Sequence, residues 1–192
     1  MPELDPSTFS ELAIASTRMR LAALTVADLD RPSSCEGWMV RDVLAHLVGG
    51  NVRFAQALRG QRPDWQSRDR HQTTAPLAEF DPTAAELADA IEGIDDPTRH
   101  VLLPAGEPPA SFAVRVHAAD MLIHGWDIAV STNQDRTLPP ELCVAAMTVL
   151  ERYPSSFWGA HRYFATPPRE VRSASPQERL LTMAGRDPTL QL

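Results

Sequence analysis

The apolar residues near the start of the chain recur three and four positions apart, which places their side chains on one face of a helix. Pro6 and Ser7 precede this pattern, as residues at a helix start commonly do. The pattern predicts a helix over residues 7–27 whose inward face carries apolar or small side chains at Phe9, Leu12, Ser16, Met19, Ala23 and Val26.

Two further long helices are predicted from the same spacing. One covers residues 40–60, after a break at Pro32, and carries His46. The other is expected to begin with Ser111 as its cap and to run to Val130. Because this second helix is apolar on most of its circumference, it belongs in the centre of a bundle.

Three shorter helices complete the predicted pattern. Asp81-Pro82 is a candidate start for the first of them, and residues 141–152 form the second. Ser175 opens a capping box that leads into the third, which should stop at Gly185. The chain is therefore expected to end in a short docked helix.

These elements predict an all-α fold. No stretch alternates apolar and polar residues over several positions, as a half-buried strand would. The helices are expected to form an up-down bundle with one or two long connections. A chain of 192 residues that is 43% hydrophobic is long enough for one core, so residues 1–192 are expected to form a single domain.

Composition removes several classes of function. The net charge is −7 with no basic block, so nucleic acid is not an expected partner. The chain has no long apolar run and no signal peptide at its start, which predicts a cytoplasmic protein with no membrane partner. All 18 basic residues are arginine, which excludes a Schiff-base or P-loop lysine.

Four polar residues interrupt the apolar surface of the central helix. His117, Asp120, His124 and Asp127 fall at about 0°, −60°, −20° and −80° around its axis, within one narrow arc. Burying such groups without partners is unfavourable, because each loses its hydration and gains nothing in return. The arc must therefore face a partner, a cavity or a metal ion.

Asp120 and His124 lie one helical turn apart, so a carboxylate oxygen and an imidazole nitrogen can reach the same divalent ion. His46 is the candidate third ligand, because it also lies in an apolar helix. The other histidines, His71, His100 and His161, lie in polar or connecting segments. The same spacing also suits satisfied polar groups of a core, with His124 paired to Asp120 and His46 bonded to a carbonyl.

Other residues are candidates for supporting roles. His117 or Asp127 could orient the ligands as a second layer. Trp38, Trp65, Trp126 and Arg53 could provide an apolar wall and an anion contact for a substrate, although tryptophans in a core and a solvated arginine are the simpler interpretation.

The two cysteines are far apart in the sequence, which indicates neither a disulfide framework nor a cysteine-rich zinc site. Cys35 precedes a predicted helix whose dipole could activate it as a nucleophile or redox switch. A buried structural cysteine is the simpler interpretation of Cys35, and Cys143 is expected in the core.

Two segments stand out: CEGWMVRDVLAHLVGG over residues 35–50 and DMLIHGWDIA over residues 120–129. They resemble the signature stretches of the DinB-like superfamily, in its mycothiol-dependent maleylpyruvate isomerase N-terminal domain branch. With the segments at residues 175–181 and 185–188, the chain is most similar to an uncharacterised actinobacterial metal-binding group within that branch.

The resemblance implies a four-helix bundle with a metal ion held by His46, Asp120 and His124. The metal would be zinc, nickel or iron, with zinc favoured. The implied function is that of a thiol-dependent transferase or isomerase, in which the metal activates mycothiol or a similar thiol toward an electrophilic substrate. A homodimer is also implied.

The sequence departs from the isomerase in two respects. The first ligand on the later helix is Asp120 where the isomerase has glutamate, and the isomerase has an additional C-terminal domain. A metal-dependent hydrolase and a non-catalytic metal-binding or stress-response module therefore stay as alternatives.

Overall fold

The computed structural model describes residues 4–66, 74–153 and 175–190, and within these the regular elements are helices joined by loops with isolated bridges. The all-α prediction is confirmed. The elements are α1 (Pro6–Ala22), the 3-10 helix η1 (Val26–Asp30), α2 (Val40–Leu58), α3 (Pro76–Glu92), α4 (Ala110–Ser131), α5 (Pro140–Leu150) and α6 (Pro176–Met183).

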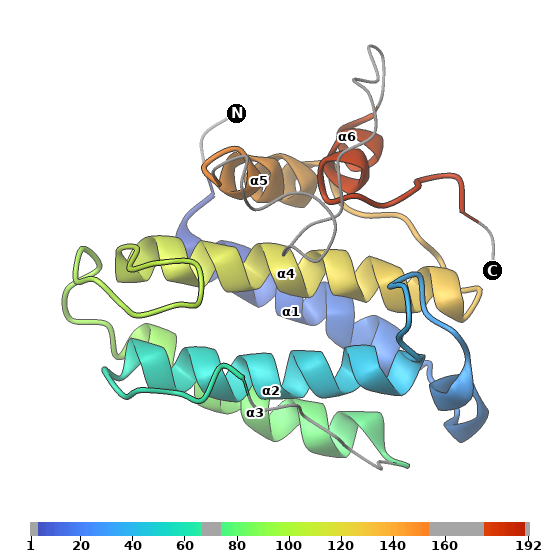
Figure 1. Ribbon diagram of the computed structural model, residues 1–192, viewed down its shortest axis with the longest axis horizontal. Coiled ribbons are helices and arrows are strands. Elements are labelled where there is room, and N and C mark those ends of the chain that lie inside the picture. The colour runs from blue at the N-terminus through green and yellow to red at the C-terminus, as the bar shows by residue number, and fades with distance from the viewer. Residues whose placement is uncertain (1–3, 67–73, 154–174, 191–192) are drawn as a thin grey trace.

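Helices α1 to α4 form the bundle (Figure 1). α1 packs against α4, α4 against α2, α2 against α3, and α3 against α1, so the four helices close into a ring. α5 lies against α4 on its outer side, and the short helix α6 lies against α5. This gives α4 neighbours on several sides, as predicted for a helix that is apolar on most of its circumference.

The packing between α1 and α4 is unusually close at Gly125. A Cβ atom placed on Gly125 would lie 2.5 Å from the Thr17 hydroxyl oxygen and 3.4 Å from the Thr17 Cα. The same hydroxyl donates a hydrogen bond of 2.8 Å to the carbonyl of Met121. Glycine is therefore required at this position for α1 to approach the helix that carries Asp120 and His124.

The predicted length of α1 was wrong, and its predicted inward face was right only at Phe9 and Ser16. The helix ends at Ala22, because the Thr25 amide and hydroxyl bond the Asp28 carboxylate and start the separate helix η1. Leu12 and Met19 are 43% and 69% exposed. The close contact with α4 shifts the buried face away from Leu12 and Met19. The buried residues of α1 are Phe9, Ser10, Ala13, Ser16, Thr17, Arg20 and Leu21.

Helix α3 begins earlier than predicted, at Pro76, and continues through Pro82. An internal proline removes one backbone hydrogen bond and usually ends a helix. Here Phe80 before Pro82 and Leu87 after it are both completely buried, so packing on each side of the proline offsets that loss.

The start of α4 also differs from the prediction. Its N-cap is Pro109, and Ser111 lies inside the first turn. The free amides of Ala110 and Ser111 donate to the carbonyls of Arg99 and Pro97, at 2.8 and 3.0 Å. Loop carbonyls thus replace the expected serine cap.

Other boundaries agree with the prediction. α2 covers Val40–Leu58, and its first turn is capped by the Asp42 carboxylate, which accepts from the Met39 amide at 2.8 Å. The capping box of α6 is present, with Ser175 and Glu178 bonded reciprocally. None of the helices in the described part of the chain is long and apolar enough to span a membrane.

Candidate metal centre

His46, Asp120 and His124 converge where α2 faces the middle of α4. His46 Nε2 lies 2.9 Å from Asp120 Oδ2, and His124 Nε2 lies 3.4 Å from Asp120 Oδ1. One ligand atom from each residue lies within 4.8 Å of the others. Two ligands of a tetrahedral zinc ion, each at about 2.1 Å, are themselves about 3.4 Å apart, so the three residues fit such an ion with small adjustments.

Asp120 and His124 stabilise each other's charged forms. Asp120 is only partly buried; this burial opposes its ionisation, but the neighbouring His46 and His124 hold its pKa well below the ordinary value. Burial likewise lowers the pKa of His124, but the Asp120 carboxylate and further hydrogen bonds raise it well above the ordinary value. The site therefore places one carboxylate between two imidazoles, and a divalent cation could bind these three groups in place of the imidazole protons.

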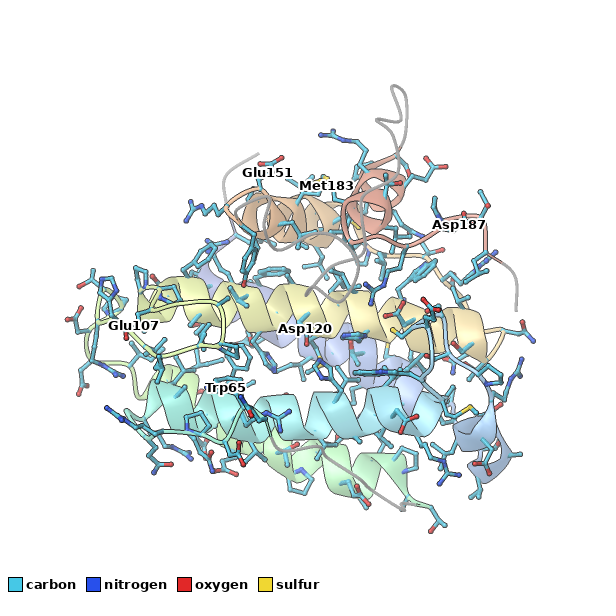
Figure 2. The ribbon with its side chains drawn as sticks, viewed as in Figure 1. Trp65, Glu107, Asp120, Glu151, Met183 and Asp187 are labelled. Carbon is cyan, nitrogen blue, oxygen red and sulfur yellow. The ribbon has the colours of Figure 1, made fainter. Side chains whose placement is uncertain are left out.

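One side of the triad is open to solvent. The side chains of Asp120 and His46 are 41% and 32% exposed, whereas His124 is nearly buried. Asp120 lies in the middle of α4 on the side that faces α2 (Figure 2). A small molecule could therefore approach a metal ion held by these residues, as at catalytic rather than structural metal sites.

Asp127 fixes the orientation of the His124 ring. Its Oδ2 lies 2.9 Å from His124 Nδ1, and the other carboxylate oxygen accepts from the Ser34 hydroxyl at 2.6 Å. Asp127 is completely buried. Burial opposes its ionisation, but Arg186 and His124 hold the pKa of Asp127 well below the ordinary value. With Nδ1 directed at this carboxylate, Nε2 of His124 is directed at Asp120.

Trp38 lies against both histidines of the triad. A tight turn before α2 brings it there, with hydrogen bonds from Ser33 N to Trp38 O and from Trp38 N to Cys35 O. Its ring is stacked on His124 at 6.1 Å between centroids and lies edge-on to His46 at 5.5 Å. With 37% of its surface exposed, Trp38 borders the site rather than the core.

The other two tryptophans of the described residues, Trp65 and Trp126, lie elsewhere. Trp126 is completely buried, as expected for a core residue. Trp65 is half-buried and lies edge-on to Phe54 of α2, at 5.3 Å between centroids. Arg53 is half-buried on α2, seven residues beyond His46. The interpretation of these aromatic residues as core therefore holds for Trp126 and is wrong for Trp38.

Cys35 lies beside the site instead of at the start of α2. Its sulfur is 3.3 Å from Asp127 Oδ2 and 3.8 Å from His124 Nδ1. It is half-buried and free. Cys143, by contrast, is a core residue, and burial raises the pKa of its thiol to about 12.

Cys35, His124 and Asp127 form a second group with metal-ligand spacing. The guanidinium of Arg186 already lies in this group, 2.8 Å from Asp127 Oδ2 and 3.5 Å from Cys35 Sγ. A second cation at the same place would be repelled by this fixed positive charge. The triad of His46, Asp120 and His124 is therefore the better candidate for a metal.

The two other histidines of the described residues, His117 and His100, are not part of the triad. His117 is buried on α4, one turn before Asp120, with its ring against Phe54. His100 is exposed in the loop before α4. His71 and His161 lie outside the described residues.

Arg186 contacts the site through Asp127, and the sequence patterns did not predict this contact. It follows a short helix near the end of the described chain, and no spacing rule connects it to Asp127, 59 positions earlier. The only signal was the similarity of residues 185–188 to the end of related proteins, which carried no role for the arginine.

The fold and this centre define a helical-bundle protein with a candidate metal site of two histidines and one carboxylate. The chain matches the family model "Mycothiol maleylpyruvate isomerase N-terminal domain" over residues 11–129. That stretch contains all three residues of the triad and more than half of the 192-residue chain. The protein belongs to this family, as the two signature segments predicted.

Relatives of similar length also exist. Two uncharacterised proteins of Mycobacterium tuberculosis, from strains CDC 1551 and H37Rv, are each 28% identical to this chain over 189 residues. The alignments cover 95% of this chain and 98% of each relative. Both relatives therefore align with this chain over nearly all of their length.

Two crystal structures of a mycothiol-dependent maleylpyruvate isomerase, one of them a histidine-to-alanine mutant, share the fold. The mutant structure has a TM-score of 0.57 at 16% identity, and the other has 0.52 at 18%. Each match covers 73% of this chain but 65% of the isomerase. The bundle is therefore common to both proteins, while part of the isomerase has no counterpart in the match.

Proposed function

We propose that this protein binds one divalent metal ion through His46, Asp120 and His124 and acts as a thiol-dependent isomerase or transferase. The observation that carries the proposal is the convergence of these three donors, from α2 and α4, at a point open to solvent. Zinc suits this ligand set best, and nickel or iron are also compatible with it.

A divalent ion bound here would make a coordinated thiol acidic, so that a thiolate is available near neutral pH. The chain's own residues would orient the site. Asp127 holds the His124 ring with Nε2 toward Asp120, and Trp38 covers one side of both imidazoles. The exposed edge of Asp120 leaves an approach for the thiol and its electrophile.

The family supports a thiol as the cosubstrate. Its description names mycothiol, and the two solved neighbours are described as mycothiol-dependent. We therefore propose mycothiol or a similar low-molecular-weight thiol, with a small electrophilic molecule as the substrate. Asp120 is one methylene shorter than glutamate, so the electrophile of this protein need not be that of the isomerase.

The metal content of the purified, untagged protein tests the first part of this proposal. We expect about one equivalent of metal in the wild type and a large loss in His46→Ala, Asp120→Ala and His124→Ala, because each variant removes a ligand. His100→Ala removes an exposed histidine and should keep the metal. Elemental analysis of all five proteins gives the result, and a wild type without metal under zinc-replete conditions would contradict the proposal.

Titration of the zinc-loaded protein with mycothiol tests the second part. Saturable binding that disappears in Asp120→Ala is expected for a thiol-dependent enzyme. Metal binding without thiol binding would reject this part and favour the alternatives. Ester or amide turnover without a thiol would then indicate a hydrolase, and its absence a non-catalytic module.

A further inference from the structure

The segment after α6 returns to the centre of the molecule. α6 ends at Met183, and Gly185, two residues further on, is in the left-handed conformation at a φ of 74°. The Gly185 amide donates to Thr182 O at 3.0 Å and the Arg186 amide to Leu181 O at 2.8 Å, which is the Schellman arrangement. Leu180 and Leu181 are completely buried, so the turn is held at a defined place.

This turn directs Arg186 at the buried Asp127. Its Nη2 lies 2.8 Å from Asp127 Oδ2 and its Nε lies 3.2 Å from Asp127 Oδ1, so the guanidinium bonds both carboxylate oxygens. Asp127 Oδ2 in turn lies 2.9 Å from His124 Nδ1. The three side chains form a continuous path from the end of α6 to a candidate ligand.

A two-point contact of this kind fixes the plane of the carboxylate. Because Asp127 is completely buried, its charge also needs a close partner, and Arg186 supplies it. A carboxylate that is ionised and fixed in plane can hold the ring orientation and tautomer of the imidazole that it contacts. Both effects would reach a metal ion bound by the triad through His124.

We infer that Arg186 is a positioning residue for the metal centre, acting through Asp127 on His124. The inference rests on the metal site proposed above. It assigns a role to a residue that lies outside the stretch matched by the family, residues 11–129. The complete site would then require the segment after α6 as well as the four-helix bundle.

The test compares Arg186→Met with wild type for zinc affinity, by competition with a chelator, and for the absorption spectrum of the cobalt-substituted protein. We expect zinc affinity to fall about 10-fold or more, as for other lost partners of a ligand, and the cobalt bands to shift. Arg179→Met, on the exposed side of α6, is the matched control and should bind zinc as wild type does.

The double variant Asp127→Asn/Arg186→Met covers the case in which Arg186→Met fails to fold. It removes both charges, so the buried site stays neutral and the fold should be retained. Its zinc affinity should still be reduced, because His124 no longer faces a fixed carboxylate. The inference would be overturned if a folded Arg186→Met protein, or the double variant, had the zinc affinity and the cobalt spectrum of the wild type. A wild-type protein that binds no metal would instead overturn the proposed function itself.

Discussion

His117 and Asp127 lie on the same arc of α4 but have different surroundings. Asp127 is bonded by Ser34 and Arg186 and lies beside His124. His117 is packed against Phe54, and its Nδ1 has no hydrogen-bond partner among the described residues. Burial lowers the pKa of His117 to about 4, so this histidine is neutral at pH 7. Of the two, Asp127 has the contacts needed to support a ligand.

The low pKa of His117 predicts a dependence of stability on pH. Between pH 6.5 and about 4 the unfolded chain binds a proton at His117 that the folded protein does not, so acidification favours unfolding. The contribution is at most about 3 kcal/mol, from about 1.4 kcal/mol per pKa unit. Urea unfolding of metal-free protein across this range should show a smaller loss of stability in His117→Leu. Equal losses in the two proteins would contradict the prediction.

At the scale of elements, the site depends on how closely α1 approaches α4. Thr17 and Gly125 set this distance, and Gly125 directly follows His124 in the chain. The Thr17 hydroxyl is buried and bonded to Met121 O, so it cannot turn away without losing that hydrogen bond. Any side chain at residue 125 must therefore move one helix relative to the other.

Gly125→Ala should destabilise the protein by about 1–3 kcal/mol, the usual range for an overfilled core. Gly50→Ala is the matched control in α2, because an added Cβ there meets no atom within 4 Å. The higher helix propensity of alanine should make that variant more stable by up to about 1 kcal/mol. Chemical denaturation of both variants checks the pair, and an unchanged stability of Gly125→Ala would show that the helices separate without cost.

At the scale of the whole molecule, the candidate metal centre joins segments distant in the chain. α2 provides His46, α4 provides Asp120 and His124, and the turn after α6 provides Arg186. A metal bound only by the folded protein would stabilise all of these contacts together. The melting temperature therefore measures the combined effect of metal binding on all of these segments.

Zinc should raise the melting temperature of the wild-type protein. A free concentration 100 times the Kd contributes about 2.7 kcal/mol, which corresponds to about 5–10 °C in a domain of this size. Asp120→Ala should show a much smaller rise. Calorimetry with and without a chelator measures the melting temperatures. An equal rise in wild type and Asp120→Ala would show that the stabilising zinc binds at another site.

Much of the fold was predictable because helices follow from local spacing. The bounds of α2, the central place of α4 and the capping box of α6 each depend on residues within a few turns of one another. The turn spacing of Asp120 and His124 is likewise a property of one helix. Their convergence with His46 required only that two apolar helices pack face to face.

The sequence by itself thus determined the helical class and the family, because helix spacing and the two signature segments are short-range patterns. It also predicted His46, Asp120 and His124 as candidate ligands. The tertiary structure alone decided which face of α1 is buried, that α3 continues through Pro82, and that Trp38 and Arg186 reach the site. These features depend on contacts between segments far apart in the chain, where packing and buried charge outweigh local preference.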